Sequence, residues 1–292
     1  MALVRKMPRT LSLATLFGLV LATGASAKPE TPAKPPADKP APKPPAAPPA
    51  DKLKVNAPDA DKIIASVEDR PDGKDQTSTV TLEIQPKKGT KRIRQLNLLR
   101  KEAPDMTKLV TVFISPADVR DAAFLVWDEH NKPDRRWLYL PAIGQVRRLS
   151  SGEDRSSFFG SDFVYEDLTN RDPEQDTHTF VATQKVGTWD CWVIDSTPKN
   201  AKGLDFVRYR SWVWKDDPIF VRQEYYDAAG KVVRRGQTLK LQKVQNIWTW
   251  HQGTMENVKT GSKTLLEVTS VKYNTGIADE RFMEDQLSRG AP

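Results

Sequence analysis

The chain has almost none of the side chains on which disulfides and zinc sites depend. It contains one cysteine, Cys191, and three histidines, His130, His178 and His251. A single cysteine cannot form an internal disulfide, so stability must come from a packed core. Without an HExxH motif, a histidine pair at ligand spacing or a second cysteine, the sequence gives no support to a zinc site. We expect neither a metal nor another cofactor.

Catalytic motifs are also missing from the sequence. It contains no GxGxxG and no P-loop, and Gly160-Ser161-Asp162 lacks the second glycine of a nucleophile elbow. The acidic residues that follow, Glu166, Asp167, Asp172 and Glu174, stand beside Arg171, where a solvated or capping role is favoured over general acid and base work. We therefore predict that the protein is not an enzyme.

Long apolar runs are absent apart from one near the start of the chain. The run from Leu11 to Ala22 follows three basic residues and precedes Ala25-Ser26-Ala27. It falls short of the roughly 20 apolar residues that a membrane span needs. Basic start, apolar centre and small residues together predict a secretory signal peptide over residues 1–27, cleaved on export to the periplasm. The alternative is a retained membrane anchor.

Residues 28–57 contain no glycine and are dominated by proline, alanine and lysine. This composition favours extended polyproline II structure, so we interpret the segment as a semi-rigid tether, with an unpartnered tail as the alternative. Of the formal net charge of +7, the leader and this linker each carry +3, which leaves +1 for residues 58–292. A globular part with so little net charge gives no support to nucleic-acid binding.

The remaining sequence predicts a single, mainly β domain over residues 58–292. A short helix is expected over residues 59–67, and a second near residues 279–287. Between them lie short β-branched or aromatic segments separated by turn residues, with no intervening helical pattern. The expected strands are 78–84, 91–100, 108–115, 123–127, 135–140, 146–149, 177–185, 188–197, 204–214, 219–226, 231–244, 247–257 and 263–273. So many antiparallel strands must curl into a barrel or half-barrel, with a β-sandwich as the alternative.

Alternation along the later strands places apolar side chains on both faces of the sheet. In 204–214, Phe206, Trp212 and Trp214 share a face with two arginines, opposite Val207, Tyr209 and Val213. Trp248 and Trp250 share a face on a following strand. Such strands have both faces covered or line a ligand cavity with one of them; for each tryptophan alone, a core position is the alternative.

An aromatic and basic motif fills residues 136–168. Trp137 and Tyr139 lie on a strand that turns at Pro141 and Gly144, so the segment is predicted to form a hairpin. Arg147 and Arg148 follow, and either bind an anionic head group or pair with nearby carboxylates. Beyond them, a polar loop carries four aromatic residues: Phe158, Phe159, Phe163 and Tyr165.

This motif resembles the signature of LolA-like outer-membrane lipoprotein-sorting proteins, over most of residues 58–285. The resemblance rests on WLYLP at 137–141, Arg147-Arg148, SFFGSDF at 157–163 and YEDL at 165–168. It implies a curved, half-open antiparallel β-barrel with short helices forming a lid, and an apolar cavity for acyl chains. It also implies association with inner-membrane resistance-nodulation-division (RND) transporters.

We therefore predict a periplasmic carrier that binds the acyl chain of a lipid or lipoprotein and transfers it between envelope membranes or transporters, with peripheral contact to a membrane. The alternative is a non-catalytic docking subunit of an envelope transporter complex; an enzyme on the same scaffold is a third hypothesis. The candidate cavity and lid residues are Trp137, Tyr139, Arg147, Arg148, Phe158, Phe159, Phe163, Tyr165, Phe206, Trp212, Trp214, Trp248 and Trp250.

Overall fold

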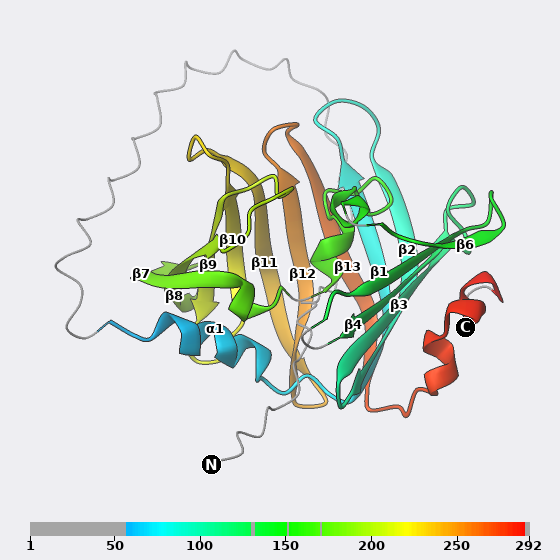
Figure 1. Cartoon of the computed structure of the whole chain (residues 1–292), viewed down its shortest axis with the longest axis horizontal. Helices are drawn as coiled ribbons and strands as arrows, with labels where there is room; N and C mark the ends of the chain where they lie inside the picture. Colours follow the sequence, from blue (N-terminus) through cyan, green and yellow to red (C-terminus); the bar gives the residue numbers. More distant parts are fainter. Residues whose placement is uncertain (1–56, 130–131, 151, 170, 290–292) are drawn as a thin grey trace, which may run out of the picture. The chain divides into compact units, whose positions relative to one another are not determined.

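A computed structural model describes residues 57–129, 132–150, 152–169 and 171–289. The predicted signal peptide and nearly all of the predicted linker lie outside these residues. Thirteen strands form one antiparallel sheet that curls strongly (Figure 1). Their bounds are β1 Asp75–Gln85, β2 Arg92–Ala103, β3 Met106–Ser115, β4 Ala123–Glu129, β5 Arg135–Leu140, β6 Gln145–Arg148, β7 Asp176–Val186, β8 Trp189–Pro198, β9 Arg208–Trp214, β10 Phe220–Tyr226, β11 Val232–Val244, β12 Ile247–Asn257 and β13 Ser262–Tyr273.

The strand order explains how the sheet curls without closing. Sequential hairpins run from β1 to β6 in one direction and from β13 back to β7 in the other, and β1 pairs with β13 in the middle. The two free edges, β6 and β7, are consecutive in the sequence. The predicted mainly β, open, curved architecture is confirmed. The sandwich alternative is wrong, because all thirteen strands belong to one sheet.

The predicted N-terminal helix is confirmed as α1 (Ala60–Glu68), capped by Asp59, whose side chain accepts a hydrogen bond from the backbone of Lys62 at 3.2 Å. The buried face of α1, formed by Ala60, Ile63, Ile64 and Val67, packs against Ile194 and Val213. We call the face of the sheet that carries these two residues, together with Leu82 and Leu96 at the other end, the inner face. The helix therefore covers the inner face at the β7 to β10 end (Figure 1).

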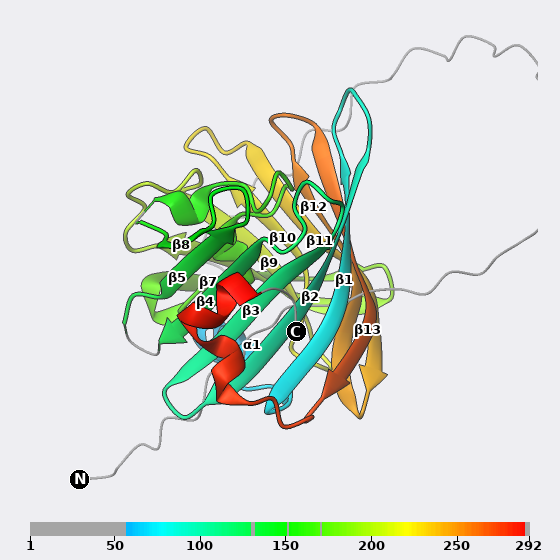
Figure 2. The same cartoon turned by 90° about the vertical axis from the view of Figure 1, so that its right-hand side faces the viewer.

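The C-terminal segment covers the opposite, outer face. The helix expected over 279–287 is present as two short 3₁₀ turns, Asp279–Phe282 and Glu284–Arg289. Phe282 is fully buried against Leu99, Val112, Leu125 and Trp137, and its carbonyl accepts a 2.8 Å hydrogen bond from Trp127 Nε1. Figure 2 shows this segment in red, in front of β3 and β4. It is therefore no lid for the inner face.

No helix in the described ranges is both long and apolar enough to cross a membrane.

The C-terminal cover gives a first prediction. Replacing Phe282 with alanine should lower the free energy of unfolding by about 3–5 kcal/mol, because a fully buried aromatic ring leaves a cavity. The neighbouring Met283 is 43% exposed, so Met283→Ala should cost less than about 1 kcal/mol. Urea unfolding of both variants measures the difference. Equal losses would contradict the placement of the segment.

A buried charge cluster lies where the chain enters β1. The Arg100 guanidinium, on β2, is 1% exposed and binds the carboxylates of both Asp72 and Glu102. Thr107 Oγ1 donates to Glu102 at 3.1 Å. Burial raises the pKa of Asp72 to about 6 and that of Glu102 to about 7, against the opposing charge of Arg100. Two carboxylates thus share one cation in a poorly solvated place.

The cluster predicts a pH-dependent difference between the wild type and Glu102→Gln. Because the folded pKa of Glu102 lies above its ordinary value of 4.5, the folded chain binds this proton more tightly than the unfolded chain, and stability is gained as pH falls from about 7 to about 4.5. At pH 8 the uncharged variant should be more stable by about 1–3 kcal/mol. This advantage should shrink towards pH 5 in urea titrations. A difference that does not change with pH would refute the assignment.

Candidate functional site

The segment that joins the two free edges of the sheet crosses the inner face. We call its residues 156–169 the strap. Ser157 and Val164 form an isolated antiparallel bridge, and the backbone of Phe158 donates to the carbonyl of Phe163 at 2.8 Å. Between them the chain turns through Phe159 and Gly160 at positive φ, 49° and 75°, a conformation that glycine adopts without strain. A 3₁₀ turn, Tyr165–Leu168, completes the strap. The strap is therefore a locally hydrogen-bonded unit.

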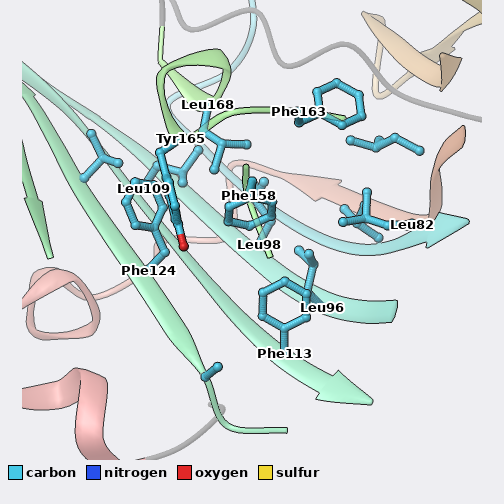
Figure 3. Packing of buried hydrophobic residues seen from close by; sticks show 14 of the residues in the cluster. Leu82, Leu96, Leu98, Leu109, Phe113, Phe124, Phe158, Phe163, Tyr165 and Leu168 are labelled. Carbon is cyan, nitrogen blue, oxygen red and sulfur yellow. The ribbon is translucent and has the colours of Figure 1, made fainter. Parts of the chain in front are cut away.

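Aromatic side chains of the strap fill the inner face over β1 to β5 and the adjoining β12 and β13. Phe158, Phe163, Tyr165 and Leu168 are buried in one cluster with inner-face residues of these strands (Figure 3). Ring centroids of Phe158 and Phe113 lie 5.6 Å apart, and those of Tyr165 and Phe124 lie 4.8 Å apart. The strand residues in the cluster are Val80, Leu82, Leu96, Leu98, Leu109, Phe113, Phe124, Val126, Leu138, Met255, Leu266 and Val268.

Polar contacts fasten the strap to four strands, one of them β5, where Arg136 Nη2 donates to Thr169 Oγ1 at 3.1 Å. On β13, Thr264 Oγ1 accepts from the Asp162 backbone at 2.9 Å and donates to its carboxylate at 2.7 Å, and Ser262 donates to the same carboxylate. On β2, Arg92 Nη2 donates to the carbonyl of Gly160 at 3.1 Å. On β11, Arg234 forms an ion pair with Asp167. These contacts lie far apart along the strap, so it is held at its tip and at its base.

Buried charges at the base of the strap continue towards β7. Burial raises the pKa of the Asp167 carboxyl, which the Arg234 guanidinium opposes. Asp176 accepts a 2.6 Å hydrogen bond from the Tyr209 hydroxyl and is paired with Arg171 at 2.9 Å. Each buried carboxylate therefore has a cation or hydroxyl partner, the arrangement expected of a structural network. Of the four acidic residues for which the sequence favoured a solvated or capping role, Asp167 pairs with Arg234, and Asp172 caps a 3₁₀ turn by accepting from the Glu174 backbone at 3.1 Å.

The structure brings together only part of the predicted site. Phe158, Phe163 and Tyr165 share the strap cluster, and Phe159 is half-buried beside it, 4.3 Å from the Phe113 ring. Trp137 and Tyr139 instead lie on the outer face under the C-terminal segment. Arg147 pairs with Glu153 at 2.8 Å, and the Arg148 guanidinium lies 6.0 Å from the Trp137 ring centre. The structure thus pairs Arg147 with a nearby carboxylate, one of the two roles expected for it.

The later aromatic candidates are dispersed. Phe206 precedes β9 and packs with Tyr209 at 5.9 Å, so it does not share the face of Trp212 and Trp214 as the alternation suggested. Trp212 donates to Gln184 at 2.9 Å, in a cluster with Cys191 and Val193 on the outer face. Trp214 packs edge-on against Trp248, with ring centroids 5.1 Å apart.

Trp250 lies elsewhere, donating from Nε1 to Thr238 Oγ1 beside Gly253. A β carbon at Gly253 would lie 3.0 Å from the Trp250 ring, so the glycine leaves room for this ring beside the strand. Register shifts between β11 and β12 at Thr238 to Leu241 accompany this packing. Trp250 therefore has no part in the contact that joins Trp214 to Trp248, because these irregularities change which side chains are neighbours.

Sequence reasoning missed the β1 to β4 half of the inner face. Leu96 and Leu98 on β2, Phe113 on β3 and Phe124 on β4 carry most of the surface that the strap covers. The available signal was the alternation in β2, where Arg92, Arg94, Leu96 and Leu98 occupy one face. No group of three or more histidine, cysteine or carboxylate side chains within the described part of the chain could hold a metal ion.

Comparison with known proteins places this architecture in a family. A family model described as that of an uncharacterized protein matches residues 105–289, which include the strap and the strands that it crosses. The structure is similar to that of a putative outer membrane lipoprotein-sorting protein domain from Vibrio parahaemolyticus, with 27% identity, 79% of this chain and 98% of that chain covered, and a TM-score of 0.74. The chain belongs to the LolA-like outer-membrane lipoprotein-sorting protein family.

Two further structures support the LolA-like fold. A DUF1329 family protein from Desulfovibrio piger shares 27% identity, covers 78% of this chain and 97% of its own, and gives a TM-score of 0.73. A LolA superfamily protein from Nitrosomonas europaea is 16% identical, covers 77% of this chain and 98% of its own, and gives 0.60, a likeness of fold alone. Comparison with functionally curated proteins gives no match.

The contacts of the strap tip yield a prediction about its mobility. Asp162→Ala removes the side-chain bonds to Ser262 and Thr264, so the tip should open more often while the aromatic cluster still favours the closed state. Hydrogen exchange of strap amides should accelerate about fivefold or more, equivalent to roughly 1 kcal/mol. Asp285→Ala, on the C-terminal segment, is the matched control. Unchanged strap exchange in Asp162→Ala would show that these bonds do not hold the tip.

Proposed function

We propose that this LolA-like protein is a non-catalytic periplasmic carrier that holds the acyl chain of a lipid or lipoprotein on the inner face of its sheet. The observation that carries the proposal is the strap, which spans the open side of the sheet and buries its own aromatic side chains on a contiguous apolar surface. A surface of this kind, covered only by a loop, can exchange its cover for hydrocarbon.

The magnitudes support such an exchange. Burying Phe158, Phe163, Tyr165 and Leu168 contributes about 1.5–3 kcal/mol each relative to exposure, or roughly 10 kcal/mol together. An acyl chain with about 17 buried carbons gains about 0.8 kcal/mol per carbon relative to water, or roughly 14 kcal/mol. The two terms are similar, so neither the empty closed state nor the loaded open state is overwhelmingly favoured. A carrier that must both take up and release its cargo needs this balance.

The way the strap is fastened fits a movable cover. Its internal bonds, from Ser157 to Val164 and from Phe158 to Phe163, are independent of the sheet, so it can lift without losing its own structure. The tip contacts at Arg92, Ser262 and Thr264 are exchangeable for water. The ion pair of Asp167 with Arg234 is more deeply buried and would serve as the fixed base.

Export and delivery complete the proposal. The signal peptide predicted over residues 1–27 would direct the chain to the periplasm. The proline-rich linker would act as a tether, and an inner-membrane RND-type transporter or a membrane surface would supply or receive the lipid. The alternative is a docking subunit without cargo. The filled inner face favours that alternative if the strap never opens, so the uptake of lipid decides between them.

The deciding experiment combines native extraction with uptake of a defined lipid. Full-length protein purified from the periplasm should yield bound lipid on organic extraction and mass spectrometry. Delipidated protein should take up a fluorescent C18 fatty acid, and Asp162→Ala should take it up at least about threefold faster, because strap opening precedes binding. Empty extracts and no uptake by either protein would overturn the carrier and leave the docking subunit. Equal uptake rates for the two proteins would show that the tip contacts do not control the opening of the strap.

A further inference from the structure

One arginine on the inner face has no adequate partner. Arg94, on β2, is 8% exposed, and its Nε and Nη1 atoms have no hydrogen-bond partner among the described residues. Its nearest carboxylate is that of Asp118, with Oδ2 3.7 Å from Nη2, beyond hydrogen-bond distance. The Asp118 side chain is 65% exposed, so water screens what attraction remains. Burial lowers the pKa of Arg94, and Asp118 opposes this only in part.

A buried guanidinium that lacks partners is unfavourable by several kcal/mol in general, so proteins rarely retain one without a use. The other buried arginines near the strap are better compensated. Arg100 binds two carboxylates, and Arg234 binds Asp167. Each of these two leaves only its Nε without a hydrogen-bond partner, whereas Arg94 leaves both Nε and Nη1 and has no buried carboxylate beside it among the described residues.

Arg94 lies at the edge of the apolar surface beneath the strap. Arg94 pairs with Leu82 of β1 and lies two residues before Leu96 on the same strand, and both leucines belong to the cluster under the strap. Two residues before Arg94, on the same face of the strand, Arg92 donates to the carbonyl of Gly160 at the strap tip. Along one strand face, two arginines at the rim thus give way to Leu96 and Leu98 inside.

We propose that Arg94, assisted by Arg92, binds the anionic group of the cargo lipid, a carboxylate or phosphate, while its chain extends along Leu96, Leu98 and Phe113. This inference rests on the proposed carrier function and names the class of cargo: an acyl lipid with an anionic head group at the strap tip. When the tip lifts, Arg92 releases Gly160 and both guanidinium groups face the entering head group. Charge-assisted hydrogen bonds of this kind are about twice as strong as neutral ones.

The test compares two probes of equal chain length, oleate and oleyl alcohol, by calorimetric titration of the delipidated full-length protein at pH 8. Wild type should bind oleate at least about tenfold more tightly than the alcohol. Arg94→Met should abolish that preference and leave the affinity for the alcohol unchanged, and Arg94→Lys should restore part of it. Arg210→Met is the matched control, because Arg210 lies on β9, where Asp195 accepts from it at 2.6 and 2.9 Å.

The Tm of each variant distinguishes a binding role of Arg94 from a structural one. Removing an unpaired buried charge should raise the Tm of the empty Arg94→Met variant, whereas loss of a structural ion pair would lower it. Equal binding of oleate and alcohol by wild type, or an unchanged preference in Arg94→Met, would overturn the head-group site and leave the carrier intact. Inorganic phosphate that binds as tightly as oleate would show that the site recognises a free anion. Binding of neither probe would overturn the carrier itself.

Discussion

The structure depends on covering the inner face of a sheet that does not close. Thirteen strands curl but leave β6 and β7 unpaired with each other, so no second sheet or barrel wall buries the apolar side chains between them. Two elements supply the cover: α1 over β8 and β9, and the strap over β1 to β5 with the adjoining β12 and β13. The helix is continuous with neither free edge, whereas the strap lies in the connection between both. The element that hides the largest apolar cluster is therefore a loop, the kind of element that moves most readily.

The outer face is covered differently, and this difference assigns roles to the two faces. Phe282 and Leu287 seal Trp137 and Leu125 from outside, and Trp127 bonds directly to the Phe282 carbonyl. Lys101 and Lys108 both reach Asp279 at 3.1 Å, which adds ion pairs along the same segment. These contacts fit a C-terminal segment that stays in place on the outer face. The inner cover is fastened at its tip by hydrogen bonds that water can replace, and it leaves Arg94 Nε and Nη1 without hydrogen-bond partners among the described residues. Both features fit a surface that binds a ligand.

The sequence was a good guide to the elements and a weaker guide to their faces. Alternation and turn residues predicted thirteen strands to within a few residues, because hairpin partners are close in the chain. The start of β9 was placed four residues early, since Phe206 looks like strand but packs as a loop residue on Tyr209 and Tyr225. The face of Trp137 depends on a C-terminal segment about 150 residues away, and the neighbours of Trp250 depend on register shifts. Neither is encoded locally.

The aromatic motif of the strap was found by sequence, whereas Leu96, Leu98 and Arg94 were overlooked, because apolar alternation in β2 is what any half-buried strand displays.

If hydrocarbon lies on the inner face beneath the strap, photo-cross-linking will locate it there. A fatty acid with a diazirine near its tail would be bound to the full-length protein, activated by light, and its adducts mapped by peptide mass spectrometry. We expect adducts on β1 to β3 and the strap, at residues such as Leu82, Leu98, Phe113 and Phe163. Adducts confined to the outer face of β8 and β9, around Val193 and Trp212, would contradict it.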